Sequence, residues 1–181
     1  CSGDAVRFID PAVPEKGLAF DGRIAEDFKL ATGTWVSVGP LRARVIAAGA
    51  PYVQDVVVTG LDRDEVGIMI FPHVESCRKL SAALPPDATQ ATQAQIVLDP
   101  AVHGYFARLI DELGAQSTGG ASRITRALLL AEPPSIDVGE VTDKGSINQR
   151  AVLKARSALV EELYAERLTA RVIMLDQERA T

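Results

Sequence analysis

Two apolar segments separated by a short polar loop constrain the fold of this chain most strongly. Residues 52–59 (YVQDVVVT) and 66–71 (VGIMIF) are rich in β-branched residues, as strands usually are. The loop between them, GLDRDE, carries the glycine and aspartates that favour a turn. Because so short a loop cannot hold a crossover helix, the two segments are predicted to be antiparallel neighbours in one sheet.

Helical signals dominate the second half of the chain. Asp99 followed by Pro100 is typical of a helix N-cap and the first helical position. Apolar residues then recur at helical spacing up to Gly114, which is expected to end the helix. Residues 148–167 show apolar stripes at the same spacing and are predicted to form one long amphipathic helix.

The remaining predicted elements are short. They are strands at 6–9, 18–20, 34–38 and from Arg123, and a helix at 41–48. The segment from Pro85, PPDATQATQAQ, has low complexity and is expected to be a flexible connection. Strands and helices without strict alternation predict an α+β fold, with a short β-hairpin followed by a mixed sheet flanked by helices.

Composition excludes several functional classes. The net charge of −5 argues against a general affinity for nucleic acid. The sequence contains no run of 18 apolar residues, so no membrane span is predicted. Two cysteines, Cys1 and Cys77, cannot build a disulfide framework. His73 and His103 are too few for a histidine-rich metal site, so no residue is predicted to bind a metal. A cytoplasmic location is the expectation that follows.

The first residues allow two interpretations. A chain that begins Cys1-Ser2-Gly3 could be a mature bacterial lipoprotein, cut just before an acylated cysteine. Such proteins usually continue with a flexible polar tether, whereas a strand is predicted here within four residues of Cys1. A longer protein that has been cut is therefore the favoured interpretation.

The segment 22–42, GRIAEDFKLATGTWVSVGPLR, resembles the hinge region of the adenylate-forming ligases, the superfamily of acyl-CoA synthetases and adenylation domains. In that family a Gly-Arg pair precedes a charged hinge, a lysine, a glycine loop, and a strand that leads into a helix. The segment 29–36 fits the variant found in the fatty-acid-activating and carboxylate-reductase branches. FDGR, KLATGTWVSVGPLR and TDKGSINQR together are most similar to the feruloyl-CoA synthetase branch.

The resemblance implies a division of the chain. Ser2-Gly3-Asp4 matches the family's Thr/Ser-Gly-Asp motif, whose aspartate holds the ribose hydroxyls of ATP, and Arg23 would add a second contact to ribose or phosphate. Ala25 and Glu26 occupy the hinge. Residues 1–24 would then end a large N-terminal domain, and residues 25–181 would form a mobile C-terminal domain.

Two loops carry the rest of the implied site. Gly33, Thr34 and Trp35 would line the channel for the pantetheine arm of CoA. The family's catalytic lysine precedes an isoleucine in the last motif, a position that Ser146 occupies here. Lys144, displaced by two residues, is the only lysine in that loop and is expected to take the role; an ordinary turn lysine is the alternative.

The implied reaction has two steps, adenylation of a carboxylate by ATP and transfer of the acyl group to CoA. ATP, CoA and Mg²⁺ would bind mainly through the N-terminal domain, so the 181 residues alone are expected to be inactive. The acid is expected to be ferulate or a related hydroxycinnamate. Alternatives are a fatty-acyl-CoA ligase, the adenylation region of a carboxylate reductase, or a non-catalytic binding module or lipoprotein.

Overall fold

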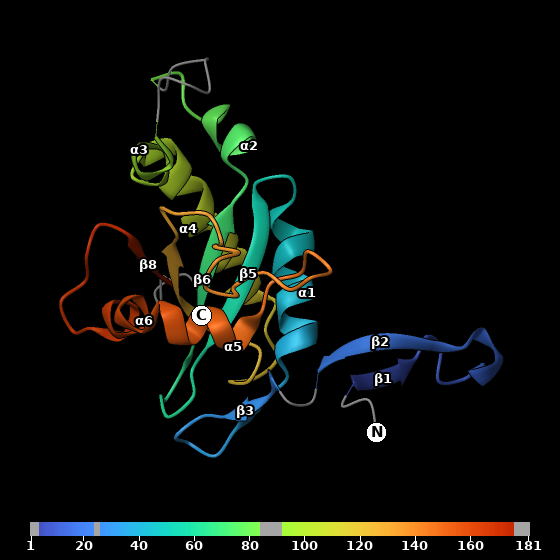
Figure 1. The fold of residues 1–181 in the computed structure, drawn as a ribbon. Helices are drawn as coiled ribbons and strands as arrows, with labels where there is room; N and C mark the ends of the chain where they lie inside the picture. The colour runs from blue at the N-terminus through green and yellow to red at the C-terminus, as the bar shows by residue number, and fades with distance from the viewer. Residues whose placement is uncertain (1–3, 24–25, 84–91, 176–181) are drawn as a thin grey trace.

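A computed structural model describes residues 4–23, 26–83 and 92–175 of the chain (Figure 1). Cys1 and Ala25 lie outside these residues. The elements in chain order are β1 (Asp4–Phe8), the 3-10 helix η1 (Pro14–Lys16), β2 (Leu18–Arg23), β3 (Phe28–Lys29), β4 (Trp35–Val36), α1 (Val38–Gly49), β5 (Val53–Thr59), β6 (Val66–Pro72), α2 (Val74–Arg78), α3 (Gln93–Val97), α4 (Pro100–Ala115), β7 (Ile124–Leu129), α5 (Gln149–Ala155), α6 (Ser157–Tyr164) and β8 (Val172–Met174).

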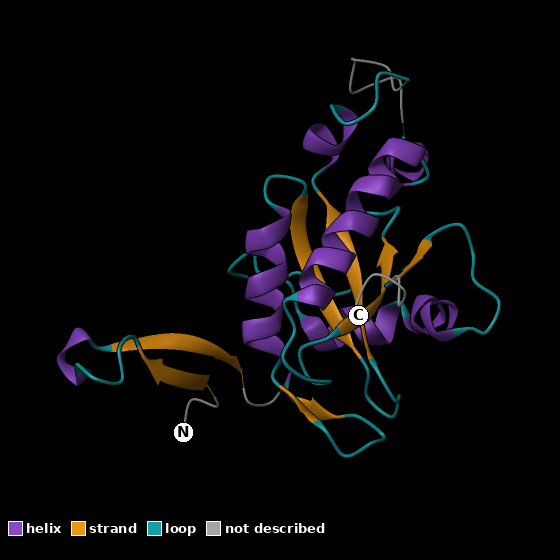
Figure 2. Cartoon of the chain, turned by 180° about the vertical axis from the view of Figure 1, so that it is seen from behind, coloured by secondary structure: helices purple, strands orange, loops and turns teal. Residues whose placement is uncertain are grey.

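A four-stranded mixed sheet forms the centre of the domain. Its strand order is β5-β6-β7-β8, with β5 and β6 antiparallel, β6 and β7 parallel, and β7 and β8 antiparallel. The predicted antiparallel pair is therefore confirmed. Helices α1 and α4 cover one face of the sheet, and α5 and α6 cover the other (Figures 1 and 2).

The two faces of the sheet bury separate apolar clusters because side chains alternate along each strand. Val56 and Ile68 pack towards α1 and α4, whereas Val57 and Met69 pack towards α5 and α6. All seven residues of β6 are buried. Burial on both sides explains why its sequence is a continuous apolar run and not an alternating one.

The hairpin of β1 and β2 projects away from the body of the domain (Figure 1). The strands pair antiparallel, and Asp4 lies opposite Arg23 in the register. At the far end, the Lys16 ammonium donates to Asp10 at 2.8 Å across the connecting segment. The predicted strands at 6–9 and 18–20 are confirmed, and β2 runs on to Arg23.

The predicted strand at 34–38 is too long. Only Trp35 and Val36 are in strand β4, and helix α1 already begins at Val38. The carboxylate of Asp27 accepts a hydrogen bond from the Val38 amide at 2.9 Å and so satisfies one of the free N–H groups at the helix start. The helix predicted at 41–48 therefore starts three residues earlier than its apolar spacing indicates.

The long helix predicted at 148–167 is wrong. The chain forms two shorter helices, α5 and α6, which meet at Arg156 with φ −109° and ψ 29°. The Arg156 side chain donates to Glu140 and to the carbonyls of Glu132 and Pro133. The non-helical backbone at Arg156 thus coincides with side-chain contacts to residues outside the two helices.

Helix α3 begins inside the segment that was predicted to be a flexible connection. Residues 84–91 lie outside the described ranges, but Thr92 and Gln95 form a capping box at the start of α3. The prediction of a flexible connection is therefore wrong for residues 92–95, which cap and begin α3. Asp99 accepts hydrogen bonds from the Ala101 and Val102 amides, which confirms it as the N-cap of α4.

Gly114 does not end α4, which continues to Ala115. A Cβ at Gly114 would lie 2.5 Å from Cδ1 of Leu175, so a larger side chain would displace the segment that follows β8. Gly114 is therefore needed for packing against Leu175. The predicted helix end is wrong by one residue, and the glycine does not act as the stop signal.

Candidate functional site

The β1–β2 hairpin brings together the two residues that were predicted to bind the nucleotide. Asp4 and Arg23 are direct cross-strand partners, although they are far apart in sequence. Ala25 lies outside the described residues, and Glu26 follows as the first described residue of the expected hinge. The backbone therefore places Asp4 opposite Arg23, which precedes the expected hinge by two positions in the sequence.

Asp27 is a residue that the sequence analysis missed. Its bond to the Val38 amide fixes the residue after the expected hinge to the first turn of α1. An aspartate can cap a helix, but Asp27 lies 11 residues before Val38, so local sequence does not connect it with the start of α1. Asp27 is therefore tied to the body of the domain through the start of α1.

Gly33 lies in a tight turn between β3 and β4. The Leu30 amide donates to the Thr34 carbonyl and the Gly33 amide donates to the Leu30 carbonyl, both at 2.9 Å. Gly33 has a φ of +85°, which glycine adopts readily. No atom lies within 4 Å of the position where a Cβ would stand, so the turn faces open space.

Strand β4 places the two other predicted channel residues beside Gly33. Thr34 is half-buried, and its hydroxyl accepts a hydrogen bond from the Thr32 hydroxyl at 3.1 Å. Trp35 is 49% exposed, whereas its neighbour Val36 is fully buried. The structure thus gathers Gly33, Thr34 and Trp35 on one short hairpin with an exposed aromatic ring.

The loop between β5 and β6 supports this turn. The Ala31 amide donates to the Arg63 carbonyl at 2.8 Å. Gly60 permits the contact, because a Cβ there would lie 2.9 Å from Cδ2 of Leu30 and 3.0 Å from Cε2 of Phe28. Gly60 also has a φ of +144°. Sequence analysis recognised this glycine as a turn residue and missed its role in the approach of the β3–β4 hairpin.

Arg63 connects the loop between β5 and β6 to helix α6. Its guanidinium pairs with Glu161 at 2.5 Å and lies 5.0 Å from the centre of the Tyr164 ring. The Tyr164 hydroxyl donates to the Glu65 carbonyl and shares a hydrogen bond with Thr59. Burial raises the pKa of Tyr164, so the hydroxyl keeps its proton and remains a donor.

Lys144 lies at the tip of a second hairpin-like loop. Val141 and Ile147 form an antiparallel bridge, and the Gly145 amide donates to the Thr142 carbonyl at 2.8 Å, which closes a turn around Lys144. Lys144 is exposed and forms no hydrogen bond or ion pair within the described part of the chain. We call residues 140–148 the lysine turn.

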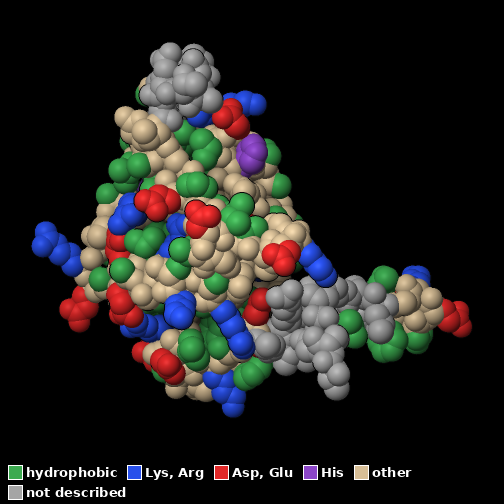
Figure 3. Space-filling model, in the orientation of Figure 1, with side chains coloured by type: hydrophobic (Ala, Val, Ile, Leu, Met, Phe, Trp, Pro, Cys, Tyr) green, Lys and Arg blue, Asp and Glu red, His purple; other side chains and the backbone are tan. Residues whose placement is uncertain are grey.

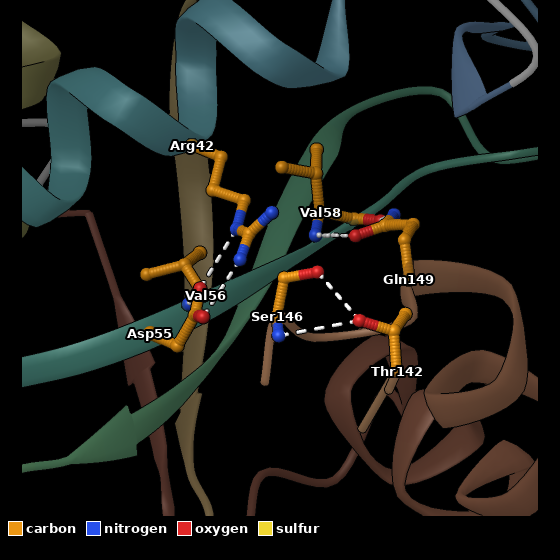
Figure 4. Close-up of polar contacts among 7 residues, drawn as sticks. All are labelled: Arg42, Asp55, Val56, Val58, Thr142, Ser146 and Gln149. Carbon is orange, nitrogen blue, oxygen red and sulfur yellow. Dashed lines mark hydrogen bonds and ion pairs between the residues drawn. The ribbon is translucent and has the colours of Figure 1, made fainter. Parts of the chain in front are cut away.

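Ser146, at the usual lysine position, has a different environment. Its hydroxyl and that of Thr142 share a hydrogen bond of 2.8 Å, and its amide donates to the Thr142 hydroxyl at 3.3 Å (Figure 4). These bonds join the two legs of the lysine turn directly below its tip. Ser146 thus stabilises the turn, while Lys144 extends the cation beyond it.

A buried ion pair holds the N-terminal leg of the lysine turn. Arg156 donates to both carboxylate oxygens of Glu140 at 2.7 Å, and the Glu140 carbonyl accepts from the Asn148 amide at 2.8 Å. The guanidinium holds the pKa of Glu140 below its ordinary value. The pair borders a hollow of about 480 Å³ between the segment 131–140 and the junction of α5 and α6.

The Gly33 turn and the lysine turn lie on different parts of the surface. In Figure 1 the turn after β3 is at the bottom of the domain, and the lysine turn lies higher, beside α1 and β5; Figure 2 shows the same separation from behind. On the face seen in Figure 3, described acidic and basic side chains are interspersed without a broad patch of one sign. This face therefore offers no broad patch of one charge sign as a candidate binding surface, and the candidate site rests on the two turns.

The remaining sulfur and imidazole groups have structural environments. The buried Cys77 thiol donates to the Tyr52 carbonyl, and burial raises its pKa to about 12. His73 caps α2 by accepting from the Ser76 amide, and burial lowers the pKa of His103. Among the described residues, no three His, Cys, Asp or Glu side chains gather as a metal site. None of the described helices combines the length and apolarity of a bilayer-spanning segment.

Residues 27–168 match the family of AMP-binding enzyme C-terminal domains. The chain belongs to this family. The match covers most of the sequence and starts at Asp27, the residue that anchors the hinge to α1. No curated protein sequence matches the chain.

Solved structures of adenylate-forming enzymes share the fold. The adenylation domain of a carboxylic acid reductase from Segniliparus rugosus, in complex with AMP and a carboxylic acid, is 22% identical, with a TM-score of 0.59 over 91% of this chain and 23% of that chain. The equivalent domain from Mycobacterium chelonae gives 22% and 0.60 with the same coverage. An anthranilate–CoA ligase in complex with anthranoyl-AMP gives 20% and 0.50, covering 87% of this chain and 23% of that chain. This chain thus spans about a quarter of each of them.

Proposed function

We propose that this chain is the C-terminal part of an ATP-dependent acid–CoA ligase that activates ferulate or a related hydroxycinnamate. The family match supports the adenylate-forming chemistry. The observation that carries the proposal is the presence of two exposed turns, one with Lys144 and one with Gly33, on separate parts of one packed domain. The choice of acid rests on the resemblance of FDGR, KLATGTWVSVGPLR and TDKGSINQR to the feruloyl-CoA synthetase branch.

The chain would divide at the hinge. Residues 1–24 would complete an N-terminal domain, and residues 25–181, with the hinge at Ala25 and Glu26, would move as the C-terminal domain. Two observations support this boundary: the β1–β2 hairpin projects from the body, and the family match begins at Asp27. The N-terminal domain is then the main partner of this chain.

Asp4 and Arg23 would bind the nucleotide together. The backbone register puts these two residues at the same end of the hairpin. A carboxylate can accept hydrogen bonds from both ribose hydroxyls, and a guanidinium can donate to ribose or phosphate oxygens in a fixed fork. This arrangement orients AMP and ATP in the same way through both steps of the reaction.

Lys144 would act in the first step. A substrate carboxylate oxygen attacks the α-phosphorus of ATP, a new P–O bond forms, and the bond to pyrophosphate breaks. Negative charge builds around phosphorus, and an ammonium about 4 Å away stabilises it by roughly 4 kcal/mol at an effective dielectric constant of about 20. Mg²⁺ would neutralise the ATP phosphates, and its ligands would lie outside the described residues. None of the described residues is therefore assigned a role in binding it.

The Gly33 turn would act in the second step. The CoA sulfur attacks the acyl carbon, the thiol proton is released, and the bond between the acyl carbon and AMP breaks. Gly33, Thr34 and Trp35 would line the path of the pantetheine arm. The open space around Gly33 and the exposed ring of Trp35 fit a narrow, partly apolar chain such as pantetheine.

A rotation of the C-terminal domain would connect the steps. Because the lysine turn and the Gly33 turn lie on different parts of the surface, one docking orientation cannot bring both to the same reacting carbonyl. Rotation about Ala25 and Glu26 would exchange them. The nucleotide contact, the hinge and the Gly33 turn follow one another in sequence, so a rotation at the hinge would move the Gly33 turn relative to an AMP held by Asp4 and Arg23.

Two alternatives share the adenylation step: the adenylation region of a carboxylate reductase would differ in the acceptor thiol, and a fatty-acyl-CoA ligase would differ in the acid. Two of the similar structures are adenylation domains of carboxylic acid reductases, and a fatty-acyl ligase would share the same pattern. The test uses the two-domain enzyme with ferulate, benzoate and decanoate, and follows pyrophosphate release and then thioester formation with CoA. We expect ferulate to react fastest and CoA to discharge the adenylate. Preference for decanoate, or an adenylate that CoA leaves intact, would overturn the proposal; no adenylation of any acid would favour a binding module.

A further inference from the structure

Gln149 is a buried polar residue to which sequence analysis assigned no role. It is the first residue of α5 and is only 2% exposed. Its side-chain amide donates to the Val58 carbonyl at 2.5 Å, and its side-chain oxygen accepts from the Val58 amide at 3.1 Å (Figure 4). Both polar atoms of one side chain thus pair with both backbone groups of one residue.

The partner residue lies on an edge strand. β5 pairs only with β6, so its other edge carries backbone groups without a strand partner. Side chains satisfy them: the Asp55 carboxylate accepts from the Val56 amide at 2.7 Å, and Gln149 bonds to Val58. Arg42 fixes Asp55 through two bonds of 2.7 Å. The Gln149 amide therefore stands where a neighbouring strand would place its peptide group.

This bond ties the lysine turn to the sheet. Gln149 directly follows the C-terminal leg, which contains Ser146 and the buried Ile147. The N-terminal leg is held by the pair of Glu140 and Arg156. The tip has no anchor of its own among the described residues, so the position of Lys144 depends on the two legs.

We propose that Gln149 is a positioning residue for adenylation, which docks the lysine turn on the edge of β5 and so fixes Lys144 relative to the sheet. The inference rests on the function proposed for Lys144. Removing the amide would release the C-terminal leg and leave two buried backbone groups of Val58 without partners. A displacement of the cation by about 1 Å is enough to cost on the order of 100-fold in rate.

The test is a double-mutant cycle in the two-domain enzyme. Gln149→Leu should slow acyl-adenylate formation by about 10- to 100-fold and leave thioester formation from presynthesised adenylate within about twofold. In a Lys144→Ala background the same substitution should change adenylation by less than about twofold, because the displaced group is already gone. Gln149→Asn, which keeps the amide on a shorter side chain, provides a milder variant if Gln149→Leu folds poorly.

Asp99→Ala is the matched control for lost stability. Asp99 is also buried and polar, but it caps α4 and has no contact with the lysine turn. The control should lower the melting temperature without a selective loss of adenylation. Amide hydrogen exchange of Val58 in the 181-residue chain reports the clamp directly, and it should accelerate in Gln149→Leu more than in Asp99→Ala.

The outcomes separate this inference from the proposed function. If Lys144→Ala leaves adenylation intact, the role of Lys144 and the positioning role both fail. If Lys144→Ala slows adenylation but Gln149→Leu adds its full cost to the double variant, only the positioning role fails. Equal loss in both half-reactions of Gln149→Leu likewise reduces Gln149 to a residue that stabilises the fold.

Discussion

The guanidinium of Arg156 donates to both carboxylate oxygens of Glu140, at 2.7 Å each, across 16 residues of sequence. The pair joins the base of the lysine turn to the junction of α5 and α6. It also lies over Phe71, whose ring centre is 5.1 Å from the guanidinium carbon. One ion pair therefore connects the base of the lysine turn, the junction of the two helices and the Phe71 ring of β6.

This pair predicts a pH dependence of folding. The pKa of Glu140 is lowered in the folded state, so the pair contributes its full stability above the ordinary value of 4.5. That contribution is lost as the pH falls below 4.5 and through the lowered pKa of the folded state, because the unfolded chain then binds the proton more tightly. Urea unfolding of the 181-residue chain between about pH 3 and 6 should show a smaller pH dependence for Glu140→Gln than for the wild type.

Asp10→Asn is the control for this experiment. The pKa of Asp10 is also lowered, by its bond to Lys16, but the pair lies on the exposed end of the hairpin. Solvent screens such a pair, so the substitution should leave the pH profile nearly unchanged. A profile that is altered equally by both substitutions would contradict a special role for the buried pair.

Local signals sufficed for the sheet and for the start of α4. The apolar runs of β5 and β6 and the Asp99-Pro100 cap depend on neighbouring residues, so sequence predicts them. Arg156, where the two helices meet, bonds to the distant Glu140, and the roles of Gly60 and Gly114 depend on Leu30 and Leu175. Apolar spacing carries no information on such distant partners.

The candidate site divides in the same way. Sequence motifs point to the Gly33 and Lys144 turns, but they do not show what holds them. Gln149 bonds to Val58 across 91 residues, and Ala31 bonds to Arg63 across the end of the β3–β4 hairpin. A single sequence gives no sign that a glutamine at a helix start replaces a missing strand.

The 181 residues alone should not release pyrophosphate. Adenylation needs phosphate donors and a carboxylate pocket arranged around the reacting atoms, and the family resemblance places these on the N-terminal domain. Incubation of the chain with ferulate, ATP and Mg²⁺ should give background rates of pyrophosphate release. Substantial turnover by the chain alone would contradict the proposed division of labour.

Cys77 should resist thiol reagents in the folded chain. Burial raises its pKa to about 12, so almost no thiolate is present near neutral pH, and the thiol is not accessible. In a Cys1→Ser variant, labelling by iodoacetamide followed by mass spectrometry should be slow, and it should become complete in urea. Rapid labelling under native conditions would mean that the segment around α2 opens readily.

Lys144→Ala in the two-domain enzyme should slow acyl-adenylate formation by a factor of several hundred, which corresponds to a loss of about 3 to 4 kcal/mol of transition-state stabilisation. Thioester formation from presynthesised adenylate should remain, because the rotation has moved the lysine turn away. Rapid-quench measurement of each half-reaction separates the two effects.

Two controls test the displaced motif. Ser146→Ala removes the hydroxyl bond to Thr142, worth about 1 kcal/mol, and should affect adenylation only mildly. Lys154→Ala removes a nearby exposed charge on α5 and should have no effect. If Ser146→Ala were as harmful as Lys144→Ala, the integrity of the turn, and not the cation, would explain the loss.

Gly33→Leu should spare adenylation and impair thioester formation. A Cβ at Gly33 would have no atom within 4 Å apart from the adjacent residues, and the side chain would project from the turn into the proposed pantetheine path. A leucine at a φ of +85° also costs about 1 kcal/mol of backbone strain, which must be separated from the steric block of the thiol path.

Gly17→Leu is the matched control, because Gly17 has a φ of +87° and equally open surroundings on the β1–β2 hairpin. Thioester formation should fall at least about tenfold more in Gly33→Leu than in Gly17→Leu, with similar melting temperatures. Equal effects of the two substitutions on both half-reactions would show that the Gly33 turn does not line the thiol path.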